Sequence, residues 1–233
     1  MANPYFQFKQ FTVWHDRCAM KVGTDAVLLG SWMRVEGARR LLDIGCGCGI
    51  IALMAAQRCQ GQIVAVEIDS DAAAQAAENV LASPWASRIR VVNQDICMFD
   101  EGPFDIIFSN PPYFVDSLKC PDIKRTSARH TDSLDFGNLM ARVNSLLSEQ
   151  GEFSLIVPMD VVDLIKAEAL SHSLFLSRET HVQTKIGISP KRALLAFRKE
   201  MPEELVEPQI LVMHTTCNSF GEEYQEMVNE FYL

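Results

Sequence analysis

The stretch LLDIGCGCGI holds the first residues whose types and spacing could do chemistry. Its alternate glycines, Gly45, Gly47 and Gly49, allow a sharp backbone turn and a close approach to a ligand. The dinucleotide pattern G-x-G-x-x-G has a wider last interval, and here Asp43 precedes the first glycine by two residues. A carboxylate at that point would repel a pyrophosphate but attract a ligand with an ammonium and a sulfonium. We therefore expect S-adenosylmethionine, rather than NAD, to bind at Asp43, Gly45 and Gly47.

Two more acids follow the next apolar runs. Glu67 stands 24 residues after Asp43, close to the spacing of about 20 residues at which an acid takes the ribose hydroxyls of a nucleotide. A carboxylate accepts two hydroxyl hydrogen bonds well. Asp95 follows the third apolar run and could accept a hydrogen bond from the adenine amino group. Both residues are therefore candidate cofactor ligands.

The segment FDIIFSNPPYF contains the third group. Two prolines cannot donate to a sheet, so they end the strand, and Pro112 forces Pro111 into an extended conformation. The side-chain oxygen of Asn110 and the carbonyl of Pro111 could then accept both N–H bonds of a planar amine. These acceptors would stabilise charge developing on the nitrogen, and Tyr113 offers a ring for stacking, worth about 1–3 kcal/mol. We predict that Asn110, Pro111 and Tyr113 are catalytic and that Asn110 also adjoins the cofactor.

These residues fall between elements that alternate along the chain. The expected strands are 40–45, 62–67, 88–93, 104–110, 151–158, 174–184 and 192–199, and the expected helices are 24–33, 49–59, 70–82, 134–149 and 159–172. Thr24 is the expected cap of the first helix, and Ser70 or Asp71 that of the third. Nearly continuous apolar strands alternating with helices indicate an α/β fold with a parallel sheet covered on both faces. We assign residues 40–233 to this domain and residues 1–39 to an N-terminal segment.

Composition narrows the class of protein further. Of 233 residues, 48% are apolar, which suffices for a packed core, and no stretch has the length of a membrane span or the form of a signal peptide. The seven cysteines form no CxxC pair. This usage is typical of a reduced cytoplasmic protein without a metal site.

The net charge of −9 is unevenly distributed. Residues 200–233 contain eight Glu and no Lys or Arg, which leaves 21 basic and 22 acidic residues in 1–199. Residues 185–199 contain five basic residues and no acid. Because local patches matter more to a polyanion than the total does, a nucleic-acid partner remains compatible with this charge.

The order DIGCGCG, Glu67, Asp95 and NPPY resembles that of the class I S-adenosylmethionine-dependent methyltransferases that modify amino nitrogens. The resemblance implies a seven-stranded, mostly parallel, Rossmann-like sheet with helices on both faces. The runs HDRCAMKVGTDAVLLG, SPWASRI and PKRALLAF are similar to a family of bacterial tRNA adenine-N6 methyltransferases, which modify the adenine just 3′ of the anticodon in tRNA1(Val). In that family KVGTD closes over the methionine part of the cofactor, which implicates Thr24 and Asp25.

An RNA substrate would also require phosphate contacts. The candidate basic residues lie near the proposed pocket in sequence or at the start of a late strand: Arg17, Lys21, Arg125, Arg129, Lys191 and Arg192. We predict no membrane attachment and no obligatory protein partner.

Other functions remain open at this point. NPPY also occurs in protein glutamine-N5 and rRNA guanine-N2 methyltransferases, although 39 N-terminal residues are too few for a peptide-binding domain. A nucleotide-binding redox protein would need a loop compatible with phosphate, and Asp43 opposes that. A catalytically inactive RNA-binding module would not need the complete set of pocket residues.

Overall fold

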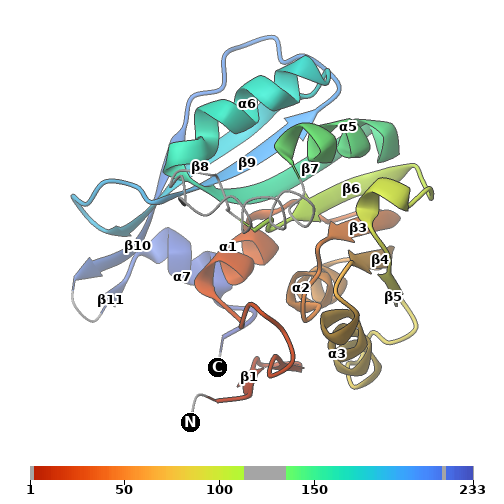
Figure 1. Cartoon of the computed structure of the whole chain (residues 1–233). Coiled ribbons are helices and arrows are strands. Elements are labelled where there is room, and N and C mark those ends of the chain that lie inside the picture. Colours follow the sequence, from red (N-terminus) through yellow and green to blue (C-terminus); the bar gives the residue numbers. More distant parts are fainter. Residues whose placement is uncertain (1–2, 113–134, 217–218, 233) are drawn as a thin grey trace, which may run out of the picture.

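The computed structural model describes residues 3–112, 135–216 and 219–232. Within these residues one sheet of nine strands crosses the molecule in the order β11-β10-β8-β9-β7-β6-β3-β4-β5 (Figure 1). The strands are β3 (Arg40–Ile44), β4 (Gln62–Glu67), β5 (Ile89–Asn93), β6 (Phe104–Ser109), β7 (Leu147–Pro158), β8 (Phe175–Lys185), β9 (Arg192–Arg198), β10 (Gln209–Thr216) and β11 (Ser219–Phe220).

Strand directions create a ligand-binding edge. Strands β5, β4, β3, β6 and β7 are parallel, whereas β9 is antiparallel to both of its neighbours, β7 and β8. Strand β3 lies between β4 and β6, so the strand order reverses beside it. Ligands of open α/β sheets bind beyond the carboxyl ends of the strands at such a reversal. The fold therefore predicts a ligand-binding site at the residues that follow β3 and β6.

The predicted fold class is confirmed, but the sheet is wider than the predicted seven strands. Residues 209–216 add β10, which pairs in parallel with β8, and β11 pairs with β10 in antiparallel orientation. Leu211 and Met213 of β10 are buried, whereas Ile210 is 47% exposed. This alternation is typical of a strand with one covered face. It lies in residues 200–233, for which the sequence analysis predicted no strand.

Helices cover both faces of the sheet (Figure 1). One face carries α1 (Thr24–Trp32), α2 (Ile50–Arg58), α3 (Ser70–Leu81) and α7 (Glu222–Val228), and the other carries α5 (Phe136–Leu146) and α6 (Val162–Ser171). Leu41 of β3 packs into the first of two apolar clusters, whereas Leu42 and Ile44 pack into the second. Each fully buried leucine contributes about 1.5–3 kcal/mol. Burial on both faces explains the continuous apolar character of this strand.

Two predicted helix caps are wrong. Helix α1 begins at Thr24 itself, and Gly23 precedes it without a side-chain capping bond. Helix α3 is capped by Asp69, whose side chain accepts a hydrogen bond from Ala72 N at 2.8 Å. The helices begin at Thr24 and Ser70, so every proposed cap already lies within the first turn.

The N-terminal residues form a hairpin of β1 (Tyr5–Gln7) and β2 (Thr12–Trp14). Its loop buries Phe8 and Phe11, whose rings stack with centroids 4.7 Å apart. The ring of Phe8 also stacks on Tyr232, and Lys9 N donates to Phe231 O at 2.9 Å. Apolar contact between the two ends of the chain thus fixes the hairpin, and both ends lie on the same side of the molecule (Figure 1).

Candidate active site

The glycine loop joins β3 to α2 in a conformation that depends on its glycines. Gly45, Gly47 and Gly49 have φ of 69°, 53° and 81°, a region that side-chain-bearing residues rarely occupy. A Cβ added at Gly45 or Gly47 would meet no atom within 4 Å, whereas one at Gly49 would lie 3.4 Å from the Cβ of Ala76. The first two glycines therefore leave an open backbone face for a ligand, and the third permits close packing on α3.

Asp43 lies beneath this loop with no exposed surface. Its Oδ2 accepts a hydrogen bond from Ala52 N at 3.1 Å, and its Oδ1 is buried without a hydrogen-bond partner among the described residues. Burial raises the pKa of Asp43 to about 8, against the opposing effect of the Ala52 hydrogen bond and with support from the charge of Glu67. A buried acceptor without a donor is costly, so a cation bound at the loop would satisfy this oxygen.

Glu67 fastens the loop to the end of β4. Its Oε2 accepts a hydrogen bond from Gly47 N at 2.8 Å, and its Oε1 accepts one from Asp69 N at 3.0 Å. Each carboxylate oxygen can accept a further hydrogen bond, as ribose hydroxyls would require. Strand pairing sets Glu67 opposite Asn93, which places Asp95 two residues beyond the end of the neighbouring strand. Asp95 Oδ1 accepts a hydrogen bond from Cys97 N at 2.9 Å.

The Asn-Pro-Pro corner lies next to the glycine loop. Ser109 pairs with Ile44 across β6 and β3, and its Oγ donates to Ile44 O at 2.8 Å. The residues that follow this pair are Asn110 and Gly45, on strands that lie about 4.8 Å apart. Asn110 is half-buried, and Pro111 is buried. The two sequence motifs, 65 positions apart, thus meet at one edge. Tyr113 lies outside the described residues.

Residues predicted for two different roles meet at the start of α1. Thr24 is exposed there, and Asp25 Oδ2 accepts a hydrogen bond from Arg192 Nε at 2.8 Å. Arg192, a predicted RNA contact, is the first residue of β9. The ion pair therefore holds the first turn of α1 at the edge of the sheet, and any role of Arg192 in RNA binding must coexist with it.

The other predicted RNA contacts are dispersed. Lys21 and Lys191 are exposed, whereas Arg17 pairs with Glu78 of α3. Arg125 and Arg129 lie outside the described residues. Among the residues that the structure describes, no group of His, Cys, Asp or Glu could hold a metal ion. No helix in these ranges has the length and apolar character needed to cross a membrane.

A comparison with protein families shows to which family a chain with this site belongs. Residues 18–157 match the methyltransferase small domain. The chain belongs to this methyltransferase family. The matched residues include the glycine loop, both acids that follow it and the Asn-Pro-Pro corner.

Relatives of this methyltransferase match its full length. A Bacteroides thetaiotaomicron protein named tRNA1(Val) (adenine(37)-N6)-methyltransferase is 52% identical over 100% of this chain and 99% of its own. Among solved structures, an Agrobacterium tumefaciens protein described as a predicted O-methyltransferase has a TM-score of 0.67 at 19% identity, covering 89% of this chain and 96% of that one. A glycopeptide N-methyltransferase in complex with S-adenosylmethionine has a TM-score of 0.53 at 13% identity, covering 70% and 87%. The two structural likenesses show the methyltransferase fold.

Sequence reasoning missed two polar residues beside the methyltransferase site, Gln75 and Asn79 of α3. The two residues are 1% and 2% exposed, and their side chains accept hydrogen bonds from the segment that precedes α1. A signal was present, because two amides four residues apart interrupt an otherwise alanine-rich helix face.

Proposed function

We propose that this methyltransferase transfers the methyl group of S-adenosylmethionine to N6 of the adenine at position 37 of tRNA1(Val). The observation that carries the proposal is that the glycine loop and Asn110 directly follow Ile44 and Ser109, which pair across β3 and β6. Similarity over the full length to relatives of that name supports the choice of substrate. We also propose that the protein acts in the cytoplasm, where tRNA is modified.

The residues around the glycine loop fit S-adenosylmethionine. Asp43 would offer to the ammonium its Oδ1, which no described residue hydrogen-bonds, and Glu67 would offer its remaining acceptor capacity to the ribose hydroxyls. Asp95 stands beyond the neighbouring strand for the adenine amino group. The exposed Thr24, at the start of α1 beside Asp25, would contact the methionine part of the cofactor, as the family resemblance implies. When bound, the cofactor supplies a methyl group on a positively charged sulfur.

Asn110 and Pro111 would act on the amine. The lone pair of an aryl amine is delocalised into the ring, so the nitrogen is a poor nucleophile. The side-chain oxygen of Asn110 and the carbonyl of Pro111 would accept hydrogen bonds from the two N–H groups of the amine. These acceptors would stabilise the positive charge that develops on the amine nitrogen. Fixing the nitrogen beside the glycine loop adds the advantage of orientation. The stacking role of Tyr113 stays a prediction.

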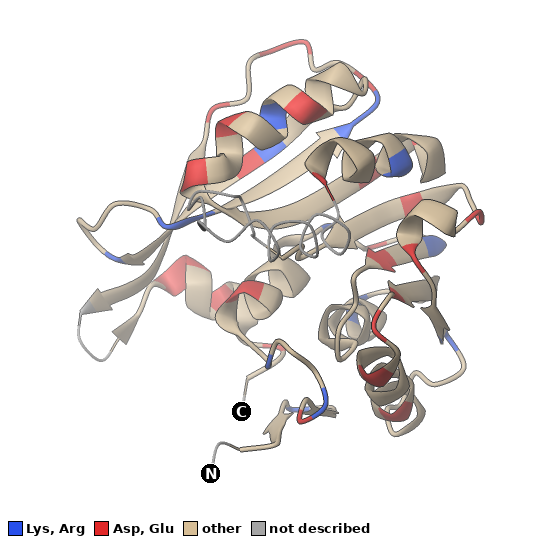
Figure 2. Cartoon of the chain, viewed as in Figure 1, with Lys and Arg blue, Asp and Glu red and all other residues tan. Residues whose placement is uncertain are grey.

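The tRNA would approach over the β8–β9 hairpin tip, residues 185–191. Arg192 pairs with Pro158, the last residue of β7, so this tip projects from the same sheet edge as the glycine loop. Lys185 and Lys191 are exposed on the tip, and residues 185–199 contain no acid (Figure 2). Basic side chains at this edge would bind phosphates close to the extruded adenine.

Labelled S-adenosylmethionine tests the proposal directly. The protein is incubated with the cofactor and, in separate reactions, total tRNA, ribosomal RNA or release factor. We expect label only in N6-methyladenosine, and digestion followed by mass spectrometry should place it at position 37 of tRNA1(Val). Label in N2-methylguanosine or N5-methylglutamine would overturn the choice of substrate. Absence of transfer to all three would overturn the proposed activity.

A further inference from the structure

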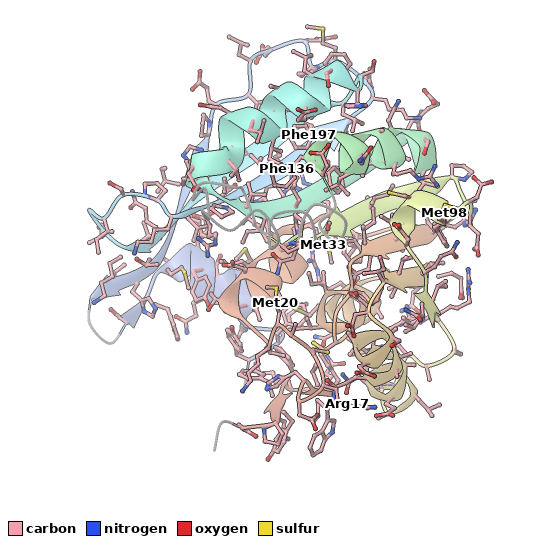
Figure 3. The ribbon with its side chains drawn as sticks, viewed as in Figure 1. Arg17, Met20, Met33, Met98, Phe136 and Phe197 are labelled. Carbon is pink, nitrogen blue, oxygen red and sulfur yellow. The ribbon has the colours of Figure 1, made fainter. Side chains whose placement is uncertain are left out.

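The segment before α1 crosses the cofactor edge without regular secondary structure. We call residues 14–25 the strap, which runs from the last residue of β2 to the second residue of α1; Figure 3 labels Arg17 and Met20 within it, where it passes between α3 and α1. Residues 15–23 form neither helix nor strand. Backbone polar groups in such a segment need partners from elsewhere. The identity of these partners shows what fixes the strap beside the glycine loop.

Asn79 joins the strap to the glycine loop. Its Oδ1 accepts a hydrogen bond from Trp14 N at 2.9 Å, and its Nδ2 donates to Trp14 O at 2.8 Å. The same Nδ2 donates to Cys48 O at 2.9 Å. A single buried amide therefore contacts both the first residue of the strap and the main chain of the cofactor loop.

Gln75 holds the next part of the strap one helical turn away. Its Oε1 accepts hydrogen bonds from Arg17 N at 3.0 Å and Cys18 Sγ at 3.2 Å. Its Nε2 donates to Asp16 Oδ1 at 2.6 Å. Between the two amides, Ala76 packs against Gly49. One face of α3 thus contacts the strap and the glycine loop together.

Two further contacts fix the end of the strap. His15 Nδ1 accepts a hydrogen bond from Val22 N at 3.4 Å, which closes residues 15–22 into a loop. The ion pair between Asp25 and Arg192 holds the last residue of the strap. Between these contacts, Met20 is 54% exposed and Lys21 is exposed. The strap is therefore fixed at both ends, and its middle is exposed.

We propose that Gln75 and Asn79 are positioning residues that couple the strap to the glycine loop, so that cofactor affinity depends on them although neither touches the reacting atoms. This inference rests on the proposed use of S-adenosylmethionine at the loop. An apolar residue could pack at either position, but only a side chain with donors and acceptors fixes the register of an irregular segment. Cofactor bound at the loop should in turn stabilise the strap, because coupling between two sites is reciprocal.

The test compares Asn79→Ala and Gln75→Ala with Gln57→Ala. Gln57 is the matched control, since its Nε2 donates to Glu230 O at 3.0 Å and so attaches a terminal segment to α2 outside the glycine loop. Calorimetry gives the Kd for S-adenosylmethionine, thermal unfolding gives stability, and steady-state rates separate KM from kcat. Each α3 variant loses three side-chain hydrogen bonds, and we expect the part of that loss that reaches the cofactor to raise Kd and the cofactor KM about tenfold. The kcat at saturating cofactor should change little, and Gln57→Ala should leave Kd unchanged.

Limited digestion with trypsin provides the second readout, because Arg17 and Lys21 are cleavage sites within the strap. Cofactor should protect both sites in the wild-type protein, and cleavage should be faster in the α3 variants. Unchanged Kd in a folded Asn79→Ala or Gln75→Ala protein would overturn the coupling, as would equal effects in Gln57→Ala. If Asn79→Ala does not fold, Gln75→Ala decides. Failure of the wild-type protein to bind the cofactor would instead refute the proposed function.

Discussion

Replacing Asp43 with Asn tests the cofactor loop through stability as well as binding. In the cofactor-free protein, burial raises the pKa of Asp43 from 3.8 to about 8. Between these values the folded chain retains a proton that the unfolded chain has released. The free energy of unfolding therefore falls as pH rises through this window. An amide at position 43 does not titrate and removes that dependence.

The size of the effect follows from the shift. Each pH unit within the window lowers the free energy of unfolding by about 1.4 kcal/mol, so at pH 7 the penalty is on the order of 4 kcal/mol. The Asp43→Asn variant places an amide where Asp43 Oδ1 is buried without a hydrogen-bond partner among the described residues, and an unpaired buried polar group costs about 1–3 kcal/mol. We therefore expect a net stabilisation of about 2 kcal/mol at pH 7, or an increase in Tm of about 4–8 °C for a chain of this size.

Calorimetry measures both the stability of the Asp43→Asn variant and its affinity for S-adenosylmethionine. Thermal unfolding of the two cofactor-free proteins at pH 5, 6, 7 and 8 should show the variant gaining on the wild type at each step. Titration with S-adenosylmethionine at pH 7, in two buffers of different ionisation enthalpy, should show about one proton released by the wild type. The variant should bind poorly, because it offers the ammonium no charge. Asp105→Asn controls for general effects of removing a carboxylate, because Asp105 Oδ2 accepts hydrogen bonds from Arg39 N and Arg40 N at the opposite end of β3 from the glycine loop.

Two results would refute this reasoning. Parallel stability curves for wild type and Asp43→Asn across the pH range would show that Asp43 holds no proton in the folded chain. Unchanged cofactor affinity in the variant would show that the carboxylate does not contribute to the loop's preference for a cation.

Three further predictions concern the remaining parts of the site. Asn110→Ala should keep its cofactor Kd but lose about 10²–10³ in kcat, as loss of a charge-stabilising group predicts; full turnover would contradict its role as acceptor. Glu67→Gln should weaken cofactor binding about tenfold in calorimetry, since it weakens both the Gly47 contact and the proposed ribose contact; equal affinity would remove Glu67 from the site. Combined Lys185→Glu and Lys191→Glu should weaken tRNA binding and reduce the log–log salt slope by about 2, whereas an unchanged slope would place the RNA surface elsewhere.

The amino-acid sequence determined the local features of this methyltransferase. Apolar runs and helical periodicity marked the seven strands from β3 to β9 and the helices between them. The glycines at 45, 47 and 49 anticipated a loop with positive φ, and the two prolines after Asn110 anticipated the end of β6. Such features depend on sterics and periodicity within a few residues, so they can be recognised without knowledge of the rest of the chain.

Only the tertiary structure decided how distant segments meet. It joined Asp25 to Arg192 across 167 positions and Asn79 to Trp14 across 65, and it added β10 beside β8. It also enclosed Asp43 so completely that its pKa rises, whereas the sequence indicated a cofactor ligand at that position but not its burial. These outcomes depend on the order of strands in the sheet and on burial, because both arise when elements far apart in sequence pack together and exclude water.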